Sequence, residues 1–205
     1  MQSTQFDRIM RRLATILAVA MLSLCLIYIT TGILLSFYYE PTAGGAYQSL
    51  KTINTQVPYG WLFRRAHDLA GNAVIVVALV QIVVMFLGRQ FSKSWLTAWI
   101  SGIFLTLSVI GLDWTAMLLD WTQVGYWRFS IELGTIEAIP FIGGQLRDIL
   151  TGGGAISTVT VAHLYTINSY ILAVAAIILA VVHLSALIWQ EQRMYQFLGT
   201  SPVKS

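Results

Sequence analysis

The chain has 205 residues, of which 57% are hydrophobic and 10% are charged, and its mean hydropathy is +0.71. Because soluble domains carry about 25% charged residues, this composition excludes a soluble globular domain and indicates a single integral membrane domain over residues 1–205. The net charge of +3 reflects membrane topology, and no basic segment indicates binding to nucleic acid.

Four apolar runs are long enough to cross a bilayer, which takes about 20 residues per helix. They cover roughly residues 13–37, 69–88, 96–119 and 164–189. The intervening segment 128–150 is less apolar and contains Pro140, which favours short helices at the membrane interface. The sequence therefore predicts an all-α membrane protein, a four-helix transmembrane bundle with short interfacial helices between the third and fourth spans.

The distribution of basic residues predicts the orientation of the bundle. Four spans place both termini on one side, and Lys and Arg favour the cytoplasmic side. The side with the termini carries seven basic residues, and the opposite side carries five. The seven are Arg8, Arg11, Arg12, Arg89, Lys93, Arg193 and Lys204; the five are Lys51, Arg64, Arg65, Arg128 and Arg147. We therefore expect cytoplasmic or stromal termini in a bacterial inner membrane or a thylakoid membrane.

Two histidines and one acid stand out within the spans. His67 lies at the start of the second span and His183 lies in the fourth, and intramembrane ionisable residues usually mark functional sites. Asp113 lies inside the third span, where a carboxylate needs a partner. Arg64 or Arg65 from the second span is the expected partner. No residue pattern predicts a catalytic group, so an enzymatic role is limited to electron transfer.

Several loop and helix-end motifs resemble one membrane protein family. They are Phe37-Tyr38-Tyr39-Glu40-Pro41-Thr42, Tyr59-Gly60-Trp61-Leu62-Phe63-Arg64, Trp121-Thr122-Gln123-Val124-Gly125-Tyr126-Trp127 and Glu137-Ala138-Ile139-Pro140-Phe141-Ile142-Gly143. With His67 and His183 in register, these motifs resemble the cytochrome b6 family, the short di-haem cytochromes b. The resemblance runs from about residue 12 to residue 190.

The resemblance implies two haem sites, each lacking one ligand. In that family the second and fourth helices each carry two histidines, fourteen or fifteen residues apart. Fourteen residues turn a helix by about 1400° and rise about 21 Å, so both ligands share one face at two depths. Carried over, the outer site would use His67 and Asn168, and the inner site Gln81 and His183. An amide is a poor ligand beside an imidazole, so His67 and His183 are the predicted metal ligands.

Other positions bear on whether a macrocycle still fits. The family's small residues beside the rings read Ala18 and Gly32 in the first helix, and Gly102 and Ala116 in the third. Arg64 matches an arginine that would meet a haem propionate. Asp68 replaces the family's basic residue after the outer histidine.

Three hypotheses about the cofactor remain open at this point. The first is haem b at one or both sites, five-coordinate or completed by water. The second is a chlorophyll-type tetrapyrrole, whose magnesium commonly takes one axial ligand. The third is a structural subunit whose pockets hold no tetrapyrrole. With haem b, the resemblance implies a membrane subunit of a quinol-linked electron-transfer complex; the other two hypotheses describe a subunit of a larger membrane complex. The candidate partners are membrane lipid, other subunits, a dimer partner and a quinone.

Overall fold

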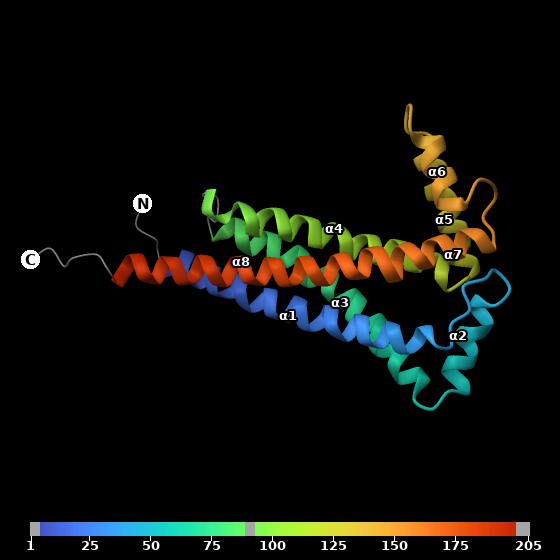
Figure 1. The fold of residues 1–205 in the computed structure, drawn as a ribbon, viewed down its shortest axis with the longest axis horizontal. Helices are drawn as coiled ribbons and strands as arrows, with labels where there is room; N and C mark the ends of the chain where they lie inside the picture. Colours follow the sequence, from blue (N-terminus) through green and yellow to red (C-terminus); the bar gives the residue numbers. More distant parts are fainter. Residues whose placement is uncertain (1–4, 89–92, 200–205) are drawn as a thin grey trace, which may run out of the picture.

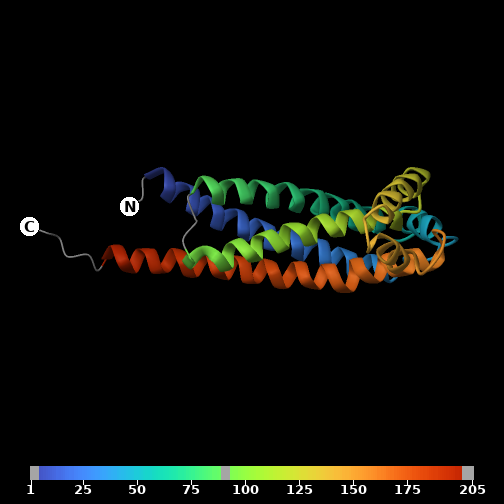
Figure 2. The same ribbon diagram turned by 90° about the horizontal axis from the view of Figure 1, so that it is seen from above.

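A computed structural model describes residues 5–88 and 93–199 of the chain. Four long helices lie side by side along the molecule (Figures 1 and 2). They are α1 (Gln5–Ser36), α3 (Gly60–Leu87), α4 (Leu96–Leu119) and α8 (Ala173–Gly199), the last continuous with α7 (Thr158–Thr166) and the turn η2 (Ile167–Leu172). All four are long and apolar enough to cross a membrane. The described residues contain no strand, so the predicted all-α bundle is confirmed.

The bundle consists of two helix pairs that close into a ring. The most extensive packing joins α1 to α3 and α4 to α8, while α1 also packs against α8 and α3 against α4. Each pair therefore brings together one helix that carries small residues and one helix that carries a histidine. This pairing decides which residues meet at each predicted site.

The short helices gather at one end of the bundle, which we call the outer end (Figure 1). They are α2 (Ala46–Thr55), α5 (Gln123–Glu137) and α6 (Gly143–Thr151). The last two correspond to the predicted interfacial segment, but α2 was not predicted. Its buried residues Ala46, Leu50 and Ile53 follow helical spacing. That spacing was available in the sequence, although the segment is short and largely polar.

The helices also extend beyond the predicted spans. α1 begins at Gln5, α3 at Gly60 and α7 at Thr158, all earlier than the apolar runs. An apolar run marks only the part of a helix that suits hydrocarbon, whereas backbone hydrogen bonding continues through polar turns. Arg89 and Lys204, two of the basic residues used for the topology prediction, lie outside the described residues.

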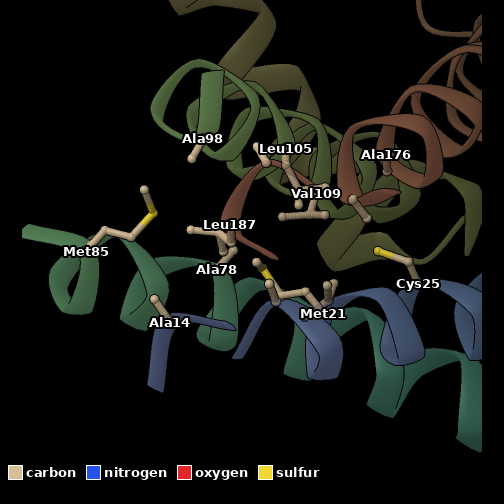
Figure 3. Close-up of a cluster of buried hydrophobic side chains, with 14 of the residues drawn as sticks. Ala14, Met21, Cys25, Ala78, Met85, Ala98, Leu105, Val109, Ala176 and Leu187 are labelled. Atoms are coloured by element: carbon tan, nitrogen blue, oxygen red, sulfur yellow. The ribbon is translucent and has the colours of Figure 1, made fainter. Parts of the chain in front are cut away.

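We call the other half of the bundle the inner half. The main core cluster runs along all four long helices and fills this half, and a second, smaller cluster packs α4, α5 and α7 at the outer end. Figure 3 shows Met21 and Met85 among small and aliphatic side chains from all four long helices. The exposed fractions of Met21, Met85, Leu105 and Leu187 are 1%, 1%, 0% and 1%. Methionine suits irregular gaps because its side chain is unbranched and flexible. The inner half is therefore close-packed.

The turn η2 is π-helical and contains Asn168. A π-helical turn holds one more residue than an α-helical turn. The fifteen-residue interval from Asn168 to His183 is therefore equivalent in rotation to about fourteen α-helical residues. This local irregularity places Asn168 on the same helix face as His183, matching the interval between His67 and Gln81 on α3.

Candidate functional site

His67 on α3 is held by a fixed set of groups on α1. Its Nδ1 lies 2.9 Å from the carbonyl oxygen of Tyr28 and 3.1 Å from the hydroxyl of Thr31. Because a carbonyl only accepts hydrogen bonds, Nδ1 carries the proton and Nε2 has the lone pair that binds metals. A Cβ on Gly32 would lie 3.0 Å from the imidazole, so the glycine permits this close approach.

His183 on α8 is held in the same way by α4. Its Nδ1 lies 2.9 Å from the carbonyl oxygen of Ala98 and 3.2 Å from the hydroxyl of Ser101. A Cβ on Gly102 would lie only 2.8 Å from the imidazole. The two histidines therefore share one arrangement, in which a small residue is preceded by a hydroxyl one position earlier and an accepting carbonyl four positions earlier. We call this arrangement the acceptor motif.

Asn168 uses a third copy of the acceptor motif. Its Nδ2 donates to the carbonyl oxygen of Leu112 and to the hydroxyl of Thr115, both at 2.8 Å, and Ala116 is the small residue. The amide thus makes the hydrogen bonds that a histidine Nδ1 makes at the other two positions. It replaces the anchoring half of an imidazole, and it also interacts with the side chain of Tyr28 on α1.

The fourth position, Gln81 on α3, has no complete acceptor motif. The corresponding residues on α1 are Ala14, Leu17 and Ala18, so the hydroxyl is missing. Gln81 instead extends to the opposite histidine, and its Nε2 lies 3.1 Å from Nε2 of His183. Since Nδ1 of His183 carries the proton, the amide of Gln81 donates and His183 accepts. The hydrogen bond therefore occupies the metal-binding nitrogen.

The inner site does not fit a tetrapyrrole. A metal between two axial nitrogens holds each at about 2.0 Å, so the nitrogens stand about 4 Å apart. Gln81 and His183 are closer than that, at 3.1 Å. Both are enclosed in the packed core, with exposed fractions of 1% and 0%. The Oε1 atom of Gln81 is buried without a hydrogen-bond partner among the described residues, which shows that the site is closed but not ideally satisfied.

The outer site, in contrast, borders two cavities of about 410 and 220 Å³. Both are lined by His67, Tyr28 and Asp68, and the second is also lined by Asn168 and Gly32. Small-molecule pockets are commonly about 300–1,000 Å³. Nε2 of His67 has no hydrogen-bond partner among the described residues. The residues of the outer site therefore fit one axial ligand to a metal tetrapyrrole.

The side chain of Tyr28 limits the space at the outer site. Its ring stacks on the His67 imidazole with centroids 3.9 Å apart and an interplanar angle of 22°. A Cβ on Gly71 would lie 3.0 Å from the Tyr28 ring, so this glycine also makes room for it. A macrocycle on His67 would share this space with Tyr28 or move its ring. Nothing in the sequence singled out Tyr28, whereas the repeated Thr-Gly, Ser-Gly and Thr-Ala pairs of the acceptor motif were a usable signal.

The charged residues at the outer site are arranged differently from the prediction. Arg64 pairs with Asp120 at 3.3 Å and not with Asp113. Among the described residues, neither Asp113 nor Asp68 has a basic partner at ion-pair distance. Both line the first cavity. Asp120 lies at the end of α4 within reach of the Arg64 side chain, which explains why it takes the arginine that the sequence assigned to Asp113.

Tyr39, in the segment after α1, lines the second cavity. Its hydroxyl donates to the carbonyl oxygen of Leu119 at 2.8 Å, and its ring lies 5.5 Å from that of Tyr165. Burial raises the pKa of Tyr39 above its ordinary value, and the nearby Asp120 carboxylate adds to the effect. The phenol is therefore a neutral donor that ties the segment after α1 to the end of α4.

These features define a class of protein: a four-helix integral membrane bundle with paired ligand positions at two depths. A family model described as cytochrome b/b6/petB matches residues 9–191. The chain belongs to this cytochrome b/b6 family, which confirms the resemblance noted in the sequence.

Individual relatives agree with this assignment. Cytochrome b6 of Cyanidium caldarium is 32% identical over 158 residues, which cover 77% of this chain and 74% of the relative. Cytochrome b6 of Mastigocladus laminosus is 33% identical over 147 residues, covering 72% and 68%. A solved structure titled Hyperthermophilic respiratory Complex III shares the fold, with a TM-score of 0.74 and 23% identity. The match covers 86% of this chain and 47% of that structure, so this chain spans about half of its length.

Proposed function

We propose that this chain is the membrane subunit of a quinol-linked electron-transfer complex and holds one tetrapyrrole, at the outer site, through His67. The observation that supports the proposal is the difference between the two metal-binding nitrogens. His67 borders a cavity and its Nε2 has no hydrogen-bond partner among the described residues, whereas Nε2 of His183 accepts a hydrogen bond from Gln81. The outer histidine, His67, is therefore available to bind a metal, whereas the metal-binding nitrogen of His183 is hydrogen-bonded within the protein.

The groups around His67 prepare it as a ligand. The carbonyl of Tyr28 and the hydroxyl of Thr31 fix the tautomer and the ring orientation, which raises the basicity of the ligating nitrogen. Gly32 lets the imidazole lie close to α1. Arg64 lines the second cavity and is held by Asp120. A bound haem would supply one-electron transfer near the outer end of the bundle.

A single site changes how electrons would move through the subunit. The two ligand positions on one helix differ in depth by about 21 Å. With the inner site closed by Gln81 and His183, no second macrocycle would extend the path towards the inner end. We propose that the chain exchanges electrons with partners on the outer side only.

Haem b is the first candidate for the cofactor, because the chain belongs to a family of haem proteins. A chlorophyll-type macrocycle is the second, since the outer site offers one histidine. Other subunits are proposed partners because the structural neighbour is part of a respiratory Complex III. A dimer partner, a quinone, membrane lipid and cytoplasmic or stromal termini remain proposals of the same kind.

A structural subunit without a tetrapyrrole is the alternative. The direct hydrogen bond between Gln81 and His183 favours it, because the side chain of Gln81 already satisfies the nitrogen of His183 that would bind a metal. The stack of Tyr28 on His67 favours it at the outer site. In this role the chain would contribute a membrane surface to a larger complex.

The pigment content of the purified complex separates these functions. After extraction of the complex from its own membranes, we expect at most one tetrapyrrole per chain, with the spectrum of a five-coordinate metal. His67→Ala is expected to remove it, and His183→Ala is expected to keep it in the chains that fold. Two macrocycles per chain, or loss with His183→Ala alone, contradict the proposal. A folded complex without pigment assigns the chain to the structural alternative.

A further inference from the structure

We infer that the side chain of Tyr28 gates the outer site: it lies between His67 and Asn168 and must move aside before a tetrapyrrole reaches Nε2 of His67. This inference rests on the proposed function, because it names a residue of this chain that determines how readily the same site binds its cofactor. It comes from the contacts of one aromatic side chain, which the resemblance to haem proteins does not account for.

The Tyr28 side chain contacts both ligand positions of the outer site. Its ring stacks on the His67 imidazole with centroids 3.9 Å apart, and it also interacts with the side chain of Asn168 on the opposite helix pair. A tetrapyrrole ring would lie between these two positions, and its metal would stand about 2.0 Å from Nε2 of His67. The phenol that joins the two positions therefore lies in the space that the macrocycle would take.

Packing holds the Tyr28 ring in this position. The residue is only 8% exposed. Its ring packs against Gly71, which follows His67 by one turn on the same face of α3, and a Cβ on Gly71 would lie 3.0 Å from Cε2 of Tyr28. The aromatic stack and the polar contact each favour this position of the ring by a few-fold. Because a ligand binds only the molecules whose site is open, the two contacts together weaken binding on the order of tenfold.

The two cavities provide room for the ring to move. Tyr28 lines both the cavity of about 410 Å³ and the cavity of about 220 Å³. A tyrosine side chain on a helix has more than one staggered rotamer to adopt. The backbone carbonyl of Tyr28 lies 2.9 Å from Nδ1 of His67, and rotation of the side chain leaves this hydrogen bond in place. The carbonyl thus orients the metal ligand, while the ring of the same residue covers it.

The test changes the side chain of Tyr28 and keeps its carbonyl. The full chain in detergent micelles is titrated with hemin, and binding is followed by the Soret band. Tyr28→Ala removes the ring, and we expect it to bind hemin about tenfold more tightly than the unmodified chain does. Tyr28→Phe removes only the hydroxyl and keeps the stack, so we expect a smaller gain of about two- to threefold.

Binding kinetics distinguish a gate from a general change in packing. A side chain that must move before the ligand binds imposes a limiting rate. At a fixed detergent concentration, the observed rate for the unmodified chain is therefore expected to level off as the hemin concentration rises. For Tyr28→Ala the rate is expected to rise in proportion to the hemin concentration. A purely structural role of Tyr28 would change the stability of the variant and leave the form of this dependence unchanged.

Matched controls make the result specific. Ile29→Ala shortens a side chain that also lines both cavities, so it adds space without releasing the stack, and the rate is expected to level off as before. Tyr47→Ala removes an exposed tyrosine on α2 that lines neither cavity, and is expected to change neither measurement. His67→Ala is expected to abolish binding. Helical circular dichroism and size-exclusion profiles confirm that each variant is folded, and Tyr28→Leu serves if Tyr28→Ala unfolds.

The outcomes separate the gate from the proposed function. If Tyr28→Ala binds hemin no more tightly and no faster than the unmodified chain, or if Ile29→Ala has the same effect as Tyr28→Ala, then Tyr28 is not a gate and the tetrapyrrole site stands. If hemin binds neither the folded unmodified chain nor folded Tyr28→Ala, the site itself is absent, and the proposed function fails together with this inference.

Discussion

The outer and inner sites hold their histidines by the same acceptor motif, but they differ in what has replaced the opposite ligand. Asn168 is short and donates to Leu112 and Thr115 at 2.8 Å on its own helix pair, and its side chain also interacts with the Tyr28 side chain on α1. Gln81 is one methylene longer and extends across the bundle to His183 at 3.1 Å. The first replacement leaves cavities beside His67, and the second closes the core. The effect of a lost ligand thus depends on the length of its substitute and on the acceptors nearby.

The largest expected difference between the sites concerns restoration of the missing ligand. Asn168→His places an imidazole where the carbonyl of Leu112 and the hydroxyl of Thr115 already accept Nδ1–H. We expect this variant to bind one low-spin, bis-histidine haem at the outer site. Gln81→His meets Leu17, which lacks a hydroxyl, and a packed core. From the sequence alone the two substitutions are equivalent, but the structure predicts no low-spin haem at the inner site.

Reduced-minus-oxidised spectra check this prediction, and each variant is the control for the other. A sharp α-band in Asn168→His and its absence in Gln81→His is the expected pair. Equal bands in both variants show that the inner core opens to admit a ring, and the comparison between the sites then fails. Adding Leu17→Thr to Gln81→His tests whether the missing hydroxyl contributes to the difference.

The sequence predicts the membrane fold well, and the site only in part. The four apolar runs and the resemblance locate α1, α3, α4 and α8, because length and hydropathy dictate helices in a membrane. They also place His67 opposite Asn168 and Gln81 opposite His183. The direct bond between Gln81 and His183 could not be predicted, because closure depends on how methionine and leucine side chains fill the space between helices. The stack of Tyr28 on His67 depends in the same way on packing against Gly71.

The π-helical turn at Asn168 could not be predicted from the sequence either. Intervals of fourteen and fifteen residues differ by about 100° in a regular α-helix, so they do not place side chains on the same face. The turn η2 (Ile167–Leu172) removes the difference by holding one additional residue. No residue in this segment is a glycine or proline that would mark an irregular turn. The face on which Asn168 lies is therefore a property of the folded helix.

The second expected difference is in stability. His183→Ala removes the hydrogen-bond partner of Gln81. Both polar atoms of the Gln81 amide are then unsatisfied in a closed core, and the loss of the bond to Nε2 costs about 1–3 kcal/mol before any cavity is counted. His67→Ala at the half-buried outer site leaves the Tyr28 carbonyl beside a cavity, and we expect a smaller loss. Thermal unfolding of both variants in the same detergent, without added tetrapyrrole, measures the difference. A larger loss for His67→Ala contradicts a closed inner site.

The smallest expected difference comes from adding one methyl group beside each histidine. A Cβ on Gly102 would lie 2.8 Å from Cε1 of His183, and a Cβ on Gly32 would lie 3.0 Å from Cε1 of His67. Inserting a methyl group into a packed core typically costs about 1–3 kcal/mol. His183 is held on both ring nitrogens and cannot shift, so Gly102→Ala is expected to fall within that range. His67 borders the outer cavities and is hydrogen-bonded only through Nδ1, so Gly32→Ala is expected to cost less. Ala116, which already carries the methyl group beside Asn168, shows that the acceptor motif tolerates it where the neighbouring side chain is short.

Thermal unfolding of Gly102→Ala and Gly32→Ala in the same detergent measures this difference in stability. Equal destabilisation means that the outer imidazole is as tightly confined as the inner one, and its role as an available metal ligand is then weakened.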